Sequence, residues 1–181
     1  MEGLKIIPYT ATDGVPTFTD SFIKGLFHRM EEEDAAGAVF YDGSVTCADD
    51  FLKTMKFGKN SLFVVEFQGK LAGCVWLNNF EVRRADFHFC FFSPLQGRDA
   101  IEAGREIVSE LLTMTKDNGE YIFDLFVGLT PTTNRAAIRW CRRMGFSTLG
   151  VLPAGAWDAA SGKSVPGLVS YVERGNYGQG R

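Results

Sequence analysis

Excess positive charge and long apolar runs are both absent from this sequence. Its 181 residues carry 19 Lys and Arg against 22 Asp and Glu, for a formal net charge of −3. A chain with that balance lacks the basic surface that nucleic-acid binding needs. Every apolar run is shorter than the roughly 20 residues that span a bilayer, and residues 1–5 lack the basic start of a signal peptide. We therefore expect neither nucleic acid nor a membrane as a partner.

Cysteine is also sparse, and the cysteines lie far apart. Cys47, Cys74, Cys90 and Cys141 form no C-x-x-C pair. This spacing favours reduced thiols in a cytoplasmic protein over a disulfide framework. No metal ion is expected.

Phenylalanine, in contrast, is abundant. Sixteen Phe stand beside three Trp and five Tyr, which predicts a core of large apolar rings with few buried hydroxyl groups. With 45% hydrophobic residues, the chain suits one compact domain, which we expect to span residues 1–175, followed by a flexible tail at 176–181. A domain of this size buries roughly 70% of its unfolded surface and needs no covalent staple.

The periodicity of apolar residues alternates between strand and helix along the chain. Helical spacing predicts helices at residues 16–31, 47–56, 98–116 and 134–144. Apolar runs bounded by turn residues predict strands at residues 4–9, 61–67, 71–80, 85–92, 121–129, 146–152 and 168–174. The predicted fold is α/β, a mixed sheet of about seven strands with about four helices in the order β-α-α-β-β-β-α-β-α-β-β.

Residues 134–146 predict an amphipathic helix with a cap at each end. Asn134 suits the N-cap, and Gly145 suits the left-handed position that ends a helix. The segment resembles the pattern Asn-x-x-Ala-[Ile/Leu]-x-Leu-Tyr-x-x-Leu-Gly-Phe of the GCN5-related N-acetyltransferases. The matching residues are Asn134, Ala137, Ile138, Gly145 and Phe146, and the substituted ones are Trp140, Cys141 and Met144. The predicted element order coincides with the topology of that family.

The resemblance implies that acetyl-CoA is the co-substrate. Members of the family bind its pyrophosphate at the N-terminus of the helix after the fourth strand, in a loop patterned [Gln/Arg]-x-x-Gly-x-[Gly/Ala], where free amides and the helix dipole attract anions. Here the corresponding residues 92–104 fit no register of that pattern cleanly. Gly97 and Arg98 favour an anion site, whereas Asp99 opposes it. The expected cofactor-binding residues are Phe91, Phe92, Gln96, Gly97, Arg98, Ala100 and Asn134.

Candidate catalytic residues lie on the predicted strand 85–92 and on the capped helix. Asp86 and His88 share one face of the strand by alternation, so His88 can accept a proton from the amine while Asp86 orients it or raises its pKa. A purely structural histidine is the alternative, and Glu81 is a weaker candidate base. Cys141 stands where the family has a tyrosine that protonates the CoA thiolate. A small buried apolar residue is the alternative for this thiol.

The leading hypothesis is transfer of an acetyl group from acetyl-CoA to a primary amine of a small molecule or peptide, by direct attack. Acidic residues at 31–34, 42 and 49–50 belong to the region that flanks the acceptor groove in the family, and they favour a cationic amine. The connection 153–167 either covers the acceptor site or is an ordinary hairpin loop. One alternative function is a non-catalytic binding or structural module that has lost cofactor chemistry. Another is an oligomer, such as a homodimer, whose aromatic residues cover a partner surface.

Overall fold

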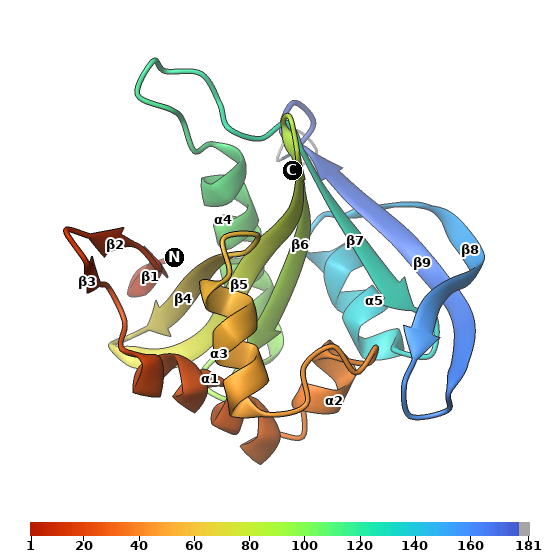
Figure 1. Ribbon diagram of the computed structural model, residues 1–181. Helices are drawn as coiled ribbons and strands as arrows, with labels where there is room; N and C mark the ends of the chain where they lie inside the picture. The colour runs from red at the N-terminus through yellow and green to blue at the C-terminus, as the bar shows by residue number, and fades with distance from the viewer. Residues whose placement is uncertain (178–181) are drawn as a thin grey trace.

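A seven-stranded mixed sheet organises the chain, as the computed structural model of residues 1–177 shows (Figure 1). Its strands, in spatial order, are β1 (Leu4–Pro8), β4 (Ser61–Phe67), β5 (Lys70–Glu81), β6 (Arg84–Phe91), β7 (Leu125–Pro131), β9 (Lys163–Glu173) and β8 (Ser147–Asp158). β6 and β7 run parallel, and each of the other neighbouring pairs is antiparallel. The predicted α/β class and the predicted order of the main elements are confirmed.

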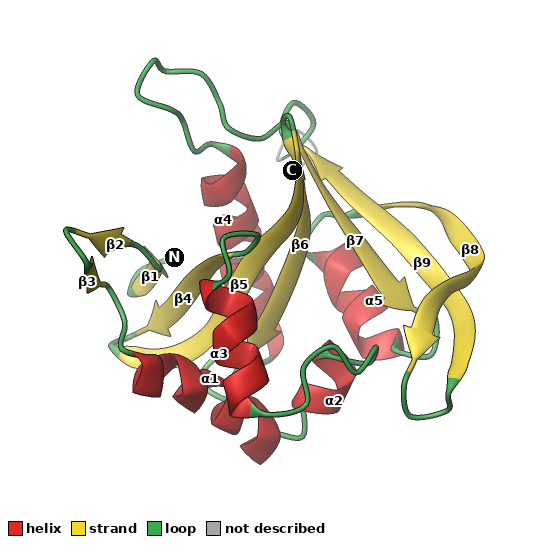
Figure 2. Ribbon diagram, in the orientation of Figure 1, coloured by secondary structure: helices red, strands yellow, loops and turns green. Residues whose placement is uncertain are grey.

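Helices cover both faces of this sheet (Figure 2). They are α1 (Asp20–Glu32), α2 (Ala36–Val39), α3 (Ala48–Lys56), α4 (Gly97–Leu112) and α5 (Arg135–Arg143). The side chains of α1 and α3 form one buried cluster with Cys74, Trp76 and Cys90 of the sheet. Those of α4 and α5 form a second cluster with Val75 and Phe87. Successive strand residues thus point to opposite layers, as the alternation of a strand requires.

The strands β6 and β7 separate soon after they meet. Their pairing covers only residues 84–86 of β6 and 125–127 of β7. Beyond that point β6 stays paired with β5, while β7 stays paired with β9. Figure 1 shows the two strands diverging from this short contact, with α5 behind the opening. The sheet is therefore split in its middle.

The first helix begins later than its apolar periodicity predicts. Pro16 lies in β3 (Val15–Pro16), which forms a small hairpin with β2 (Ala11–Thr12). The helix starts after Thr19, whose side chain accepts a hydrogen bond from the amide of Phe22. A hydroxyl acceptor at this position satisfies a free amide of the first turn, so the cap decides the boundary rather than the proline.

The region predicted as a long connection, residues 153–167, is mostly strand. β8 continues to Asp158 and β9 begins at Lys163, so the hairpin turn itself is short. Pro153 is tolerated because β8 is an edge strand with two register shifts, between Thr148 and Gly150 and between Leu152 and Ala156.

The end of the described chain packs on the domain. The hydroxyl group of Tyr177 donates to the backbone carbonyls of Arg105 and Met144, at 3.0 and 2.8 Å. Tyr177 falls within the segment for which we predicted a flexible tail. Residues 178–181 lie outside the described residues, so for them the tail stays a prediction.

Candidate functional site

A cavity of about 280 Å³ opens where β6 and β7 separate. Residues from both faces of the sheet line this cavity, because the gap between β6 and β7 passes through the sheet. The wall on the α2 side contains Ala35, Ala38, Val39, Tyr41, Trp76 and His88. The wall on the α5 side contains Phe87, Phe89, Phe91, Ala137, Trp140 and Cys141. Side chains from both layers of the fold therefore line one space.

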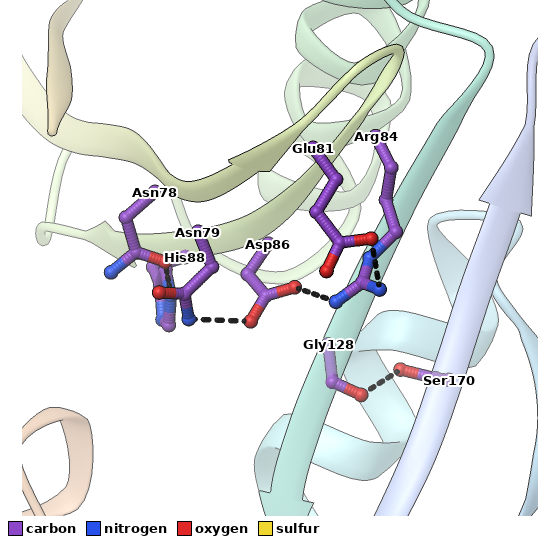
Figure 3. Close-up of polar contacts among 8 residues, drawn as sticks. All are labelled: Asn78, Asn79, Glu81, Arg84, Asp86, His88, Gly128 and Ser170. Carbon is purple, nitrogen blue, oxygen red and sulfur yellow. Dashed lines mark hydrogen bonds and ion pairs between the residues drawn. The ribbon is translucent and has the colours of Figure 1, made fainter. Parts of the chain in front are cut away.

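His88 is held in this cavity by two neighbours on β5. Its ring stacks on Trp76, with centroids 5.2 Å apart and planes 6° from parallel. Its Nε2 lies 3.0 Å from Oδ1 of Asn78 (Figure 3). A carbonyl oxygen only accepts, so Nε2 carries the proton and Nδ1 is the basic nitrogen of the neutral ring. Burial lowers the pKa of His88, and the negative charges of Asp86 and Asp42 oppose that change.

Asp86 makes no hydrogen bond with His88 and so does not orient the ring, but its negative charge raises the pKa of His88, which was the other predicted role. Its carboxylate accepts from Nδ2 of Asn79 at 2.9 Å and from the guanidinium of Arg84 at 3.3 Å. Arg84 also pairs with Glu81 at 3.3 Å, and this carboxylate is exposed at the hairpin rather than in the cavity. The strand register explains the difference. Residues 86 and 88 point the same way along β6, and the acceptor that reaches His88 comes from the neighbouring strand.

Asn78 is thus a site residue that sequence reasoning missed. It pairs directly with Asp86 across the hairpin and lies diagonal to His88. Diagonal neighbours on adjacent strands come within reach of longer side chains. The sequence predicted neighbouring strands within residues 61–92. Only the register between β5 and β6 shows that Asn78 comes within reach of His88.

Cys141 reaches the cavity from α5. Burial raises the pKa of this thiol to about 11, while a hydrogen bond with Ser170 acts in the opposite direction. Ser170 is itself buried on β9, and its hydroxyl group donates to the carbonyl of Gly128 on β7 at 3.4 Å (Figure 3). The thiol therefore stays protonated at neutral pH, and Ser170 holds it at the edge of the split.

The N-terminus of α4 presents free amides to solvent. The side chain of Gln96, at the N-cap, makes no capping hydrogen bond. Within residues 1–177 the amides of Gly97, Arg98 and Asp99 have no hydrogen-bond acceptor. Such amides bind anions, and the helix dipole adds to the attraction. The Arg98 guanidinium is 2.6 Å from the Glu102 carboxylate, so its charge is already paired.

The other predicted cofactor-binding residues occupy different places. Phe91 lines the cavity, whereas Phe92 is buried in the cluster around α1 and α3. The amide of Phe92 donates to the Ala72 carbonyl at 2.8 Å, so neither part of Phe92 is open to a ligand. Ala100 packs its side chain in the core. Asn134 lines the cavity and also caps α5, since its Oδ1 accepts from the amide of Ala137 at 3.0 Å.

Two backbone amides on β6 are candidate hydrogen-bond donors that the sequence analysis did not identify. Because the Phe92 amide faces β5, alternation turns the amides of Phe89 and Phe91 toward β7. Both residues lie beyond the last pair that β6 makes with β7. Their amides therefore point into the split and can donate to an oxygen held there.

The acidic residues that favoured a cationic amine lie outside the cavity wall. Asp49 pairs with Lys24 at 2.5 Å, and Asp50 accepts from the hydroxyl group of Thr46 at 2.9 Å. Asp42 accepts from Ser44, while Glu32 and Glu33 pair with Arg29. These contacts serve helix ends and surface ion pairs, although the charge of Asp42 also raises the pKa of His88. The preference for a cationic amine therefore stays a prediction.

A smaller hollow of about 260 Å³ adjoins the mouth of the cavity. Tyr41 and Asn134 line both spaces, and Asp158 lines the smaller one. The amide of Ala159, in the turn between β8 and β9, donates to the carbonyl of Tyr41 at 2.9 Å. The turn thereby reaches the mouth of the site, although Trp157 next to it is half exposed.

Two further properties complete the description of residues 1–177. No group of three or more His, Cys, Asp or Glu side chains in this range is arranged to hold a metal ion. No helix in the same range is both long and apolar enough to cross a membrane.

Comparison with known proteins gave no match to a family model and none to a curated protein sequence. Solved structures do match. An acetyl transferase from Salmonella typhimurium that modifies the N-terminal serine of ribosomal protein L7/L12 is 15% identical, with a TM-score of 0.71 over 96% of each chain. Spermidine N-acetyltransferase from Vibrio cholerae, in complex with CoA and spermine, is 17% identical with a TM-score of 0.67, covering 98% of this chain and 99% of that one.

The microcin C7 self-immunity acetyltransferase MccE, in complex with acetyl-CoA and AMP, also matches. It is 16% identical with a TM-score of 0.61, covering 85% of this chain and 86% of that one. At these identities the likeness establishes the fold.

Proposed function

We propose that this chain, which has the fold of the GCN5-related N-acetyltransferases, transfers an acetyl group from acetyl-CoA to a primary amine of a small molecule or peptide. The observation that carries the proposal is the cavity at the split between β6 and β7. It brings a neutral histidine from one wall and a protonated thiol from the other to one space. Direct attack of the amine on the thioester needs such a meeting of two reactants.

The α4 N-terminus supports acetyl-CoA as the co-substrate. The free amides of Gly97, Arg98 and Asp99 suit a pyrophosphate, and the apolar wall with Phe91 and Trp140 suits an uncharged arm. Among the similar structures, the spermidine N-acetyltransferase from Vibrio cholerae holds CoA and the acetyltransferase MccE holds acetyl-CoA. Because the charge of Arg98 is already paired with Glu102, we assign the binding chiefly to the backbone.

His88 is the proposed base. With Nε2 fixed on Asn78, its Nδ1 is free to accept a proton from the amine. The lowered pKa keeps the ring neutral at physiological pH, which a base requires. The amides of Phe89 and Phe91 are the proposed donors to the thioester carbonyl, because hydrogen bonds to that oxygen strengthen as it gains charge.

Cys141 is the proposed hydrogen-bond donor to the leaving thiolate. A thiol with a pKa of about 11 holds its proton more tightly than an ordinary thiol at about 8.5. Complete transfer of that proton to CoA is therefore uphill, and Cys141 stabilises the thiolate rather than replacing the family's tyrosine as a full acid.

Calorimetric titration of the protein with acetyl-CoA tests the proposal. We expect micromolar binding that weakens in Arg98→Glu, because the new carboxylate lies beside the free amides. Lys5→Glu, an equal charge change on β1, should leave binding unchanged. No binding at millimolar acetyl-CoA would refute the proposal and favour a module without cofactor chemistry.

We also infer that the protein forms a homodimer through β8. This edge strand has no charged residue between positions 147 and 157. Leu149, Val151 and Leu152 on it are 73%, 52% and 51% exposed. Monomeric proteins usually protect such edges with charges, prolines or bulges. Pro153 and two register shifts interrupt this edge, but no charge covers its exposed apolar side chains, which suit contact with a second copy. A similar structure, a spermidine N-acetyltransferase from Vibrio cholerae, is dodecameric.

The cytoplasmic location of the protein stays a prediction.

A further inference from the structure

The arginine side chains of residues 1–177 divide into two groups. One group is held in ion pairs with carboxylates and consists of Arg29, Arg83, Arg84, Arg98 and Arg174. The other group has no carboxylate partner within this range and consists of Arg105 on α4 and of Arg135, Arg139, Arg142 and Arg143 on α5. Arg105 lies against the end of α5, because its Nε donates to the Arg143 carbonyl at 2.8 Å. The unpaired arginines are therefore gathered at one helix.

The arginines of α5 share one side of the helix, and we call them the arginine face. At 3.6 residues per turn, they fall within about 100° of the helix circumference. All of these side chains are exposed. The opposite side of the helix places Cys141 in the core and packs Trp140 against it. The arginine face therefore points to solvent along the whole of α5.

The stability of the helix does not account for this arrangement. Arg139 has another arginine four residues away on each side, and like charges at that spacing destabilise a helix. Arg135 stands in the first turn, where the helix dipole disfavours a cation and no acidic residue is present. Only Arg142 and Arg143, in the last turn, gain from the dipole. An anion bound across the face would offset the repulsion between these charges.

The chain around α5 supplies no such anion. Residues 125–157 contain the arginine face but no Asp, Glu or Lys. The chain as a whole has a formal net charge of −3, so the face is a local positive region on an acidic protein. A region of this kind attracts a partner of opposite charge and speeds their association.

We propose that the arginine face binds a short acidic segment of another protein. An α-helix rises about 1.5 Å per residue, so Arg135, Arg139 and Arg143 follow one another at intervals of about 6 Å along α5. Side chains on one side of an extended peptide are about 7 Å apart. Carboxylates at alternate positions of such a segment can each meet one guanidinium group, which binds a carboxylate through two parallel hydrogen bonds.

The size and surroundings of the arginine face favour this partner over a longer polyanion or a membrane. The face extends for about 12 Å along α5, whereas a nucleic acid carries phosphates far beyond that length. The acidic remainder of the protein would repel them. A lipid surface would need apolar side chains beside the charges, and the apolar side of α5 is packed in the core. A short acidic segment gains the attraction without these costs.

Fluorescence anisotropy with the whole chain and a labelled hexaglutamate peptide tests the inference. We expect binding that weakens as salt is raised, and no binding of the uncharged control peptide, hexaglutamine. The double variant Arg139→Glu/Arg142→Glu should weaken binding by about 10-fold or more, because two attractions become repulsions. Lys59→Glu/Lys70→Glu makes the same change of charge at two exposed residues elsewhere and should leave the affinity unchanged.

A second set of variants separates binding from folding. Arg139→Gln/Arg142→Gln removes both charges and keeps good helix formers, so it should fold and lose affinity for hexaglutamate. Arg139→Lys/Arg142→Lys keeps the charges and should retain more of the affinity. Failure of hexaglutamate to bind, or equal affinity of all the variants, would overturn the inference.

Three further measurements identify the other possible occupants of the arginine face, and each would overturn the inference. Tighter binding of a thymidine oligonucleotide than of hexaglutamate would assign the face to nucleic acid. Displacement of the peptide by CoA but not by dephospho-CoA would assign it to a phosphate of the co-substrate. A lower molar mass of the Arg139→Glu/Arg142→Glu variant in light scattering would assign it to contact with a second copy of the chain.

Discussion

His88 combines three features that a base needs: a place in the cavity, a fixed tautomer and a lowered pKa. Each has a separate cause. Alternation along β6 turns the ring toward the α2 side, Asn78 fixes Nε2, and burial lowers the pKa. Trp76 limits rotation of the ring by stacking on it. A structural histidine needs only burial and one partner, so the free Nδ1 in the cavity is what distinguishes this one.

Replacing His88 by Gln should reduce kcat by about 10²- to 10⁴-fold, the usual contribution of a positioned general base. Acetyl-CoA binding should persist, because the ring lies on the acceptor side of the cavity. Steady-state kinetics with calorimetry separates the two effects. Retention of wild-type kcat would assign His88 a structural role.

The pH dependence follows from the direction of the His88 pKa. Protonation abolishes the base, so kcat/KM should decrease as pH falls through the lowered pKa of the free enzyme, and the midpoint should lie below 6.5. The negative charge of Asp86 raises this pKa, so Asp86→Asn should move the midpoint to still lower pH. Asp117→Asn, in an exposed loop, is the matched control. A midpoint that moves upward in Asp86→Asn would contradict the assignment.

At the scale of elements, α4 and α5 are packed closely by a glycine. A Cβ built on Gly104 would lie 2.2 Å from Sδ of Met144, which is fully buried between the two helices. This contact limits how near the end of α5 lies to α4, and α5 carries Cys141 and its cap Asn134 to the cavity. The approach of two helices thus positions one wall of the site.

The substitution Gly104→Ala should therefore destabilise the protein by about 1–3 kcal/mol, as overpacking does. Gly25→Ala in α1 is the matched control, because its Cβ meets nothing within 4 Å. That change should instead stabilise the protein by roughly 0.5–1 kcal/mol through helix propensity. Urea unfolding of both variants measures the difference. Equal stability of the two would mean that Met144 repacks without cost.

For the whole molecule, the exposed edge of the sheet at β8 predicts self-association. Val151→Lys places a charge in the middle of that edge and should convert a dimer to a monomer, with little effect on unfolding, because Val151 is already half exposed. Light scattering after size exclusion measures the mass. Asn118→Lys, in the loop before β7, is the charge control. A monomeric wild-type protein would refute the dimer.

The sequence by itself determined the element order and the capped helix of residues 134–146. These features depend on local periodicity and on cap residues, which act within one turn or one strand. The structure confirms Asn134 as the cap of α5 and Gly145 in a left-handed conformation, with φ of 99°. It also places Phe87 and Cys90 in opposite layers of the core, as strand alternation requires.

Only the tertiary structure decided which residues surround the cavity. The split between β6 and β7 depends on how far two strands distant in sequence stay paired, and no local pattern encodes that length. The partner of His88 depended on the register with β5, and the cavity wall on the α2 side depended on which side of α2 faces the sheet. Local periodicity sets which face a residue occupies, whereas contacts between distant segments determine which faces meet.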